Sequence, residues 1–125
     1  MFALGTDMNK QTVLVIDDDV NTRECLSILL EGDGFEVTGC ENGVVALELI
    51  KENCFDTIII DYHMPQIKGD EVVKRLRVQC SQAYIIGISV EDKRRVFMDA
   101  GANTFVAKSD IIHALASLIK NKKGL

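Results

Sequence analysis

The chain has 125 residues, 26% of them charged, with a formal net charge of −5 and an isoelectric point near 5.0. This length suits one compact domain and is too short for a second independent core. The acidic balance argues against duplex DNA as a direct ligand, because affinity for phosphates comes from clustered Lys and Arg. No apolar run approaches the roughly 20 residues that cross a bilayer, and residues 1–11 lack the features of a signal peptide, so we expect a cytoplasmic protein.

Strands and helices alternate along the predicted chain. Residues 13–16 form a β-branched run that ends at Asp17, as is typical of a strand buried on both faces of a parallel sheet. Leu26, Leu29 and Leu30 then recur at helical spacing, which predicts a helix over about 21–31 that ends at the glycines 32 and 34. The unit repeats, with strands predicted at 35–40, 57–60, 83–88 and 104–107 and helices at about 42–52, 70–78, 91–100 and 110–121.

This alternation predicts an α/β fold. Five parallel strands joined by right-handed helical crossovers form a doubly wound sheet with helices on both faces. The common order at this size is 2-1-3-4-5, which places a ligand site beyond the carboxyl ends of strands 1 and 3. We expect residues 12–122 to form the domain, between a lead-in at 1–11 and a short tail at 123–125, without a fused effector domain.

The candidate site residues all follow a predicted strand. They are Asp17 and Asp18, Asp61, Ser89 and Lys108. Three carboxylates at one sheet edge repel one another unless a cation neutralises them, and all-oxygen ligands suit Mg²⁺. We predict that Asp17, Asp18 and Asp61 hold this ion and that Asp61 is also the nucleophile that forms an acyl phosphate. Lys108 supplies positive charge and Ser89 a hydroxyl to the phosphoryl group.

Four segments carry a family resemblance: residues 15–19 (VIDDD), residues 60–65 (IDYHMP) followed by Gly69, residues 88–90 (ISV) and residues 105–108 (FVAK). In this order and at these spacings, over nearly the whole chain, the sequence resembles the receiver domains of two-component response regulators. The likeness is to single-domain receivers of the chemotaxis-Y kind, with the flavodoxin-like receiver fold. It implies a phosphoacceptor signalling domain rather than an enzyme that turns over a substrate.

The resemblance also implies residue roles and partners. The phosphoryl group would come from a sensor histidine kinase or a histidine phosphotransfer protein. The face built by helix 4, strand 5 and helix 5 would then change its output partner and could support a phosphorylation-linked dimer. The implied roles are Mg²⁺ binding for Asp17, Asp18 and the backbone carbonyl of His63, phosphoacceptor for Asp61, switch hydroxyl for Ser89, phosphoryl-binding lysine for Lys108, and inward-swinging aromatic for Phe105.

One position departs from the family pattern. Receivers usually follow the lysine with a proline in a cis peptide, whereas Ser109 follows Lys108 in this chain. A cis bond without proline costs about 3 kcal/mol, so either the fold sustains that cost or the loop takes another path. His63 and Glu91 stand two residues beyond Asp61 and Ser89, at positions that in this family influence the lifetime of the phosphoryl group.

Some of these residues have simpler interpretations. Asp19 is expected to cap the first helix, and Ser89 with Asp92 also has the spacing of a capping box. A calcium loop beginning at Asp17 is excluded, because Thr22 replaces the required glycine. The four cysteines include no CxxC pair, so reduced and partly buried thiols are favoured over metal or redox chemistry.

The residues by themselves leave three other functions to be considered. A receiver-like scaffold that takes no phosphate is kept open by the Lys108–Ser109 departure. A phosphohydrolase with an aspartyl nucleophile is less favoured, because His63 stands where such enzymes generally carry a second acid and no chain is left for a cap. A flavin carrier is disfavoured, because the first strand ends in aspartates where a phosphate-binding loop needs Gly, Ser or Thr.

Overall fold

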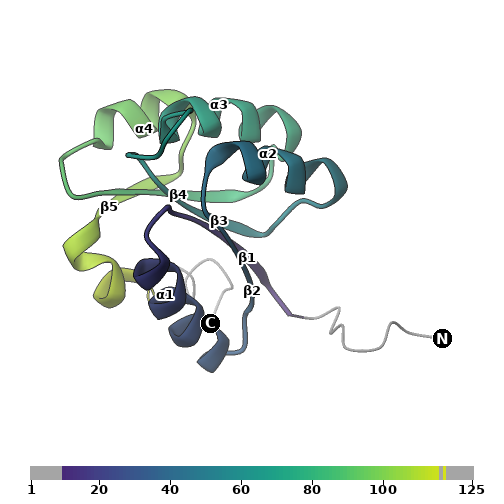
Figure 1. The fold of residues 1–125 in the computed structure, drawn as a ribbon, viewed down its shortest axis with the longest axis vertical. Helices are drawn as coiled ribbons and strands as arrows, with labels where there is room; N and C mark the ends of the chain where they lie inside the picture. The colour runs from purple at the N-terminus through teal and green to yellow at the C-terminus, as the bar shows by residue number, and fades with distance from the viewer. Residues whose placement is uncertain (1–9, 116, 118–125) are drawn as a thin grey trace.

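The computed structural model describes residues 10–115 and 117. Its centre is a five-stranded parallel sheet with the order β2-β1-β3-β4-β5, which confirms the predicted doubly wound topology (Figure 1). Ile16 pairs with Ile60 and Asp61 with Ile88, so β1, β3 and β4 end side by side at one edge. The strands are β1 (Thr12–Ile16), β2 (Glu36–Cys40), β3 (Thr57–Asp61), β4 (Tyr84–Ser89) and β5 (Thr104–Ala107).

Helices cover both faces of this sheet. In Figure 1, α2, α3 and α4 lie over one face, and α1 lies over the other face with the chain that follows β5. A short 3₁₀ helix, η1 (Lys108–Asp110), leads into a helical segment at 111–115. The predicted last helix beyond 117, most of the lead-in and the tail lie outside the described residues. The helices are α1 (Val20–Gly32), α2 (Gly43–Glu52), α3 (Gly69–Gln79) and α4 (Arg94–Ala100).

The sheet separates two apolar cores. Successive side chains of a strand point to opposite faces, so β1 contributes to both cores. Leu14 and Ile16 pack with buried residues of α2, α3 and α4, whereas Val13 and Val15 pack with Leu26 of α1 and its neighbours. Burial on both sides explains why the central strands are continuous apolar runs without a polar face.

Two predicted helix starts have different outcomes. Asp19 caps α1 as expected, its Oδ1 accepting the Asn21 backbone N–H at 3.0 Å. The capping box of Ser89 and Asp92 is wrong, because α4 begins only at Arg94. Ser89 Oγ instead accepts the Glu91 backbone N–H at 3.2 Å, while Asp92 Oδ1 accepts the Arg94 N–H at 3.1 Å. Residues 90–93 therefore form a loop between β4 and α4.

The expectation of four reduced thiols is wrong for two of them. Cys54 and Cys80 form a disulfide, with their Cα atoms 5.7 Å apart, and Cys25 and Cys40 are the free cysteines of the described residues. Cys54 precedes β3 and Cys80 follows α3. Parallel strands start at the same edge of a sheet, so the fold brings together two residues that no sequence spacing rule relates.

Gly87 is needed for the packing of α4 against the sheet. A Cβ at this position would lie 2.4 Å from the fully buried ring of Phe97. We expect Gly87→Ala to lower the free energy of unfolding by about 1 to 3 kcal/mol, because an overpacked core forces a shift of ring or backbone. Urea denaturation measures the effect. Gly32→Ala is the control, since nothing lies within 4 Å of the added atom; equal stability of the two variants would contradict the packing argument.

Candidate functional site

The ends of β1 and β3 position two buried carboxylates. Asp17 follows the last residue of β1 and is fully buried, and Asp61 is the last residue of β3 and is 4% exposed. The two strands are neighbours in the sheet, so both side chains reach the same edge. Gly69 allows α3 to start against this edge, because a Cβ there would lie 2.4 Å from the carbonyl oxygen of Asp61.

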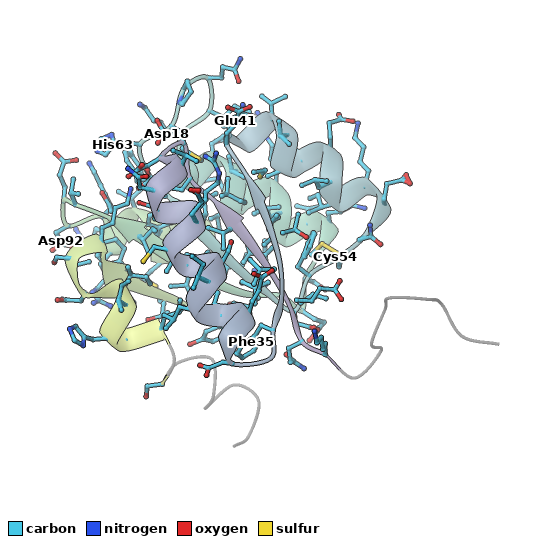
Figure 2. The ribbon with its side chains drawn as sticks, turned by 60° about the horizontal axis from the view of Figure 1, so that its bottom comes forward. Asp18, Phe35, Glu41, Cys54, His63 and Asp92 are labelled. Carbon is cyan, nitrogen blue, oxygen red and sulfur yellow. A yellow bond between two sulfur atoms is a disulfide. The ribbon has the colours of Figure 1, made fainter. Side chains whose placement is uncertain are left out.

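Asp18 completes a cluster of three carboxylates. Asp17, Asp18 and Asp61 each offer an oxygen, and these three oxygens lie within 4.8 Å of one another. Asp18 is exposed, and Figure 2 shows it at the same end of the molecule as His63. The predicted juxtaposition of the three acidic residues is therefore present, with one side of the cluster open to solvent.

Lys108 brings the opposing charge from the end of β5. Its Nζ lies 2.9 Å from Asp17 Oδ2 and 3.6 Å from Asp61 Oδ2. The described residues contain no cis peptide, so the loop takes the second of the two expected courses, with Lys108–Asp110 wound as η1. Serine in place of proline therefore does not keep the lysine out of the acidic cluster.

Burial and like charge raise the pKa values of the two inner carboxyls. Burial is the main cause for Asp61, followed by the charge of Asp17, and its pKa rises to about 6. Burial also raises the pKa of Asp17, although the Asp19 backbone N–H and Lys108 oppose the shift. Burial alone would lower the pKa of Lys108, but the carboxylates of Asp17 and Asp61 outweigh it and raise that pKa. The cluster holds more negative charge than one lysine neutralises.

The donor set fits a hard divalent cation. Asp17 Oδ1 accepts the Asp19 backbone N–H at 2.9 Å, whereas Oδ2 is buried without a hydrogen bond. Lys108 Nζ is the positively charged group beside this oxygen, at 2.9 Å. Mg²⁺ binds oxygens at about 2.1 Å, so oxygens that share one ion lie about 3 to 4 Å apart. Three carboxylates within 4.8 Å meet this need with a small contraction.

Ser89 and Phe105 lie on the next two strands. Ser89 ends β4 and is fully buried, and it pairs with Ala107 of β5. Phe105 is 5% exposed and packs against Phe97 with ring centroids 6.0 Å apart. The guanidinium of Arg94 lies 5.5 Å from the centroid of the Phe105 ring, so this ring connects the core with the surface of α4.

A contact across the mouth of the site was not predicted. His63 Nε2 lies 2.5 Å from Glu91 Oε1, and this contact lowers the pKa of Glu91. Lys93 Nζ lies 4.6 Å from the ring centroid of Tyr62 beside it. The spacing could have suggested the pair, since each member stands two residues beyond the end of one of two adjacent strands. What sequence does not reveal is that both loops turn toward each other.

The raised pKa of Asp61 predicts a pH dependence of stability. The folded chain holds this proton up to about pH 6, whereas the unfolded chain releases it near pH 3.8. Stability is therefore lost as the pH rises through this window, by about 3 kcal/mol at about 1.4 kcal/mol per pKa unit. In metal-free buffer, Asp61→Asn should raise the melting temperature at pH 7.5, and the gain should vanish near pH 4.

Thermal melts of the unaltered chain and of Asp61→Asn at the two pH values test this expectation. Asp99→Asn, at an exposed position of α4 outside the cluster, is the matched control and should leave the pH profile unchanged. If Asp61→Asn melts at the same temperature as the unaltered chain at pH 7.5, repulsion within the cluster does not limit stability.

Residues 13–120 match the response regulator receiver domain family. The response regulator MprA of Mycobacterium sp. (strain KMS) is 34% identical over 116 residues, which are 90% of this chain and 49% of MprA. The chain thus spans about half the length of the curated relatives it matches.

Solved structures agree with this match. TrrA of Thermotoga maritima, in complex with Mg²⁺-BeF, is 32% identical with a TM-score of 0.81, covering 89% of this chain and 97% of TrrA. The chemotaxis response regulator CheY4 of Vibrio cholerae is 28% identical with a TM-score of 0.84, covering 90% and 98%. Among the described residues, no helix has the length and apolar character to cross a membrane. This chain belongs to the response regulator receiver domain family, the phosphoacceptor domains of two-component signalling.

Proposed function

We propose that Asp61 accepts the phosphoryl group and that Mg²⁺ is held by Asp17, Asp18, Asp61 and the backbone carbonyl of His63. The observation that carries the proposal is the approach of three carboxylates to within 4.8 Å of one another, with Lys108 Nζ 2.9 and 3.6 Å from two of them. Such a set is suited to a metal and a phosphoryl group.

The proposed transfer assigns a step to each side chain. An Asp61 carboxylate oxygen attacks phosphorus, the bond from phosphorus to the donor histidine breaks, and its electron pair returns to the imidazole. Bound Mg²⁺ supplies charge neutralisation for the phosphoryl oxygens. Lys108 exchanges a carboxylate partner for a phosphoryl oxygen, and the Ser89 hydroxyl donates to another. Both Asp17 and Asp61 are buried, so little water competes for these contacts.

The same proposal includes the output face. A hollow of about 520 Å³ lies between α4, β5 and the helical segment after η1, lined by Arg94, Phe105, Asp110, Ala114 and their neighbours. Movement of Ser89 toward a phosphoryl oxygen would pull on the loop at 90–93, and Phe105 would move with Arg94. We therefore propose that this face changes its partner, or pairs with a second copy, on phosphorylation.

Receiver domains work with histidine kinases and phosphotransfer proteins. For this chain we propose a sensor histidine kinase or a histidine phosphotransfer protein as the donor, and the cytoplasm as the location. The output protein is left unassigned. An unphosphorylated scaffold was favoured only by the Lys108–Ser109 departure, and the contacts of Lys108 with Asp17 and Asp61 remove that reason.

Intact-mass spectrometry tests the phosphoacceptor. The chain is incubated with acetyl phosphate and Mg²⁺, and we expect one phosphoryl adduct that hydroxylamine removes, as it does from an acyl phosphate. Asp61→Asn and a chelator should each abolish the adduct. An adduct of equal size on Asp61→Asn, or none with acetyl phosphate or with candidate kinases, would contradict the proposal.

Thermal melts test the metal ligands separately from phosphorylation. Mg²⁺ should raise the melting temperature, because an ion that binds only the folded chain stabilises it by mass action. Asp18→Asn should weaken this response at least tenfold in Mg²⁺ concentration. Asp19→Asn is the matched control, since asparagine caps α1 equally well. An unchanged response of Asp18→Asn would remove Asp18 from the site.

A further inference from the structure

The disulfide of Cys54 and Cys80 lies at the sheet edge where β3 begins, whereas the carboxylate cluster lies where β3 ends. Figure 2 shows Cys54 well away from Asp18 and His63. The bond joins residues 26 positions apart. The ring that it closes contains all of β3, the loop at 62–68 and all of α3, and therefore Asp61.

Contacts other than the disulfide hold the Cys54 side of the pair in place. Asp56 Oδ2 accepts the Thr12 backbone N–H at 2.8 Å, and the Asp56 N–H donates to Thr12 Oγ1 at 3.0 Å. The Asn53 N–H donates to the carbonyl of Leu49 at 3.3 Å. The short segment at 53–56 is thus held at both ends by hydrogen bonds that do not involve sulfur.

Hydrogen bonds also hold the backbone around Cys80 in place. Its N–H donates to the Leu76 carbonyl at 2.7 Å, which ends α3. Arg77 donates to the carbonyls of Ser81 and Ala83, at 3.0 and 2.7 Å, and to that of Gly101. A Cα separation of 5.7 Å is in the middle of the range that a disulfide needs. The two thiols are therefore preorganised to react with each other, in the reduced chain as well.

One cysteine of the pair is open to reagents. The Cys54 residue is exposed and Cys80 is 3% exposed, and both line a shallow pocket of about 330 Å³ with Phe55, Gln79 and Gln82. The remaining thiols are not placed to pair with Cys54 or Cys80. Cys40 is buried and its pKa is raised to about 11, whereas Cys25 is exposed but lies on α1, on the other face of the sheet from α3.

We propose that Cys54 and Cys80 form a reversible thiol–disulfide exchange site whose co-reactants are small thiols and disulfides of the glutathione class. In the forward direction, the Cys54 thiolate attacks a sulfur of glutathione disulfide, whose S–S bond breaks and releases one glutathione thiol. Cys80 then attacks Cys54 Sγ and releases the second thiol. Two cysteine sulfurs are oxidised, one small disulfide is reduced, and the two cysteine protons leave on the two thiols.

A bond of this kind has a physical consequence for the β3–α3 unit. It ties the start of β3 to the end of α3, so the unfolded chain loses the freedom of a 26-residue loop. In the cytoplasm proposed above, a disulfide that includes an exposed cysteine such as Cys54 is expected to be transient rather than permanent. The site thus adjusts the stability of the unit that carries Asp61, and it does so whether or not Asp61 is phosphorylated.

A redox titration of the full chain tests the proposal. The protein is equilibrated at graded ratios of reduced to oxidised glutathione, free thiols are alkylated, and the peptides are mapped by mass spectrometry. We expect the 54–80 crosslink to rise with glutathione disulfide and to disappear in excess glutathione. The oxidised chain should melt about 10 °C above the reduced chain. Cys80→Ala should retain a glutathione adduct on Cys54, whereas Cys54→Ala should give none on the buried Cys80.

Cys25→Ser is the matched control, and it should keep both the crosslink and the difference in melting temperature. Four alkylated cysteines in excess glutathione disulfide would overturn the proposal, as would a crosslink that joins any other pair. A 54–80 bond that survives excess glutathione in the folded chain would also overturn it, because the bond would then be permanent. These readouts use the unaltered chain, so they stand even where a cysteine variant fails to fold.

Discussion

The repulsion between two buried carboxylates, Asp17 and Asp61, is the constraint around which the rest of the site is arranged. Both lie at the ends of adjacent parallel strands, where water is scarce, and burial with like charge raises the pKa of each. Lys108 offsets part of this cost from the end of β5. A fold that keeps such a cluster sacrifices stability at neutral pH, and it thereby keeps affinity for a cation and for a phosphoryl group.

The β3–α3 unit connects the carboxylate cluster at one edge of the sheet with the disulfide at the other edge. Its inner end carries Asp61, against which Gly69 allows α3 to begin, and its outer end carries the Cys54–Cys80 bond. Both ends are packed through one core, in which Val72 and Leu76 of α3 are fully buried. The unit is therefore a rigid connection between the two edges of the sheet, because close-packed interiors transmit displacement rather than absorb it.

The pattern of apolar residues predicted the strands, because the strands are buried in the sheet. Apolar runs located all five strands to within one residue at either end, and their carboxyl ends located Asp17, Asp61 and Lys108. The start of α4 was misplaced, because Ser89 and Asp92 satisfy a capping pattern that the path of the chain does not use. A local motif shows that a hydroxyl is able to accept a hydrogen bond. The path of the loop decides which backbone N–H lies close enough to donate it.

The sequence by itself determined the parallel sheet, the family and the gathering of acidic residues at one edge, because buried strands need apolar runs and strand ends share an edge. Only the tertiary structure decided three contacts: Lys108 with Asp17, His63 with Glu91, and Cys54 with Cys80. Each joins segments that are distant along the chain, through side chains whose reach no periodicity encodes. Such contacts depend on how loops cross the ends of the sheet, and that course is set by packing between layers.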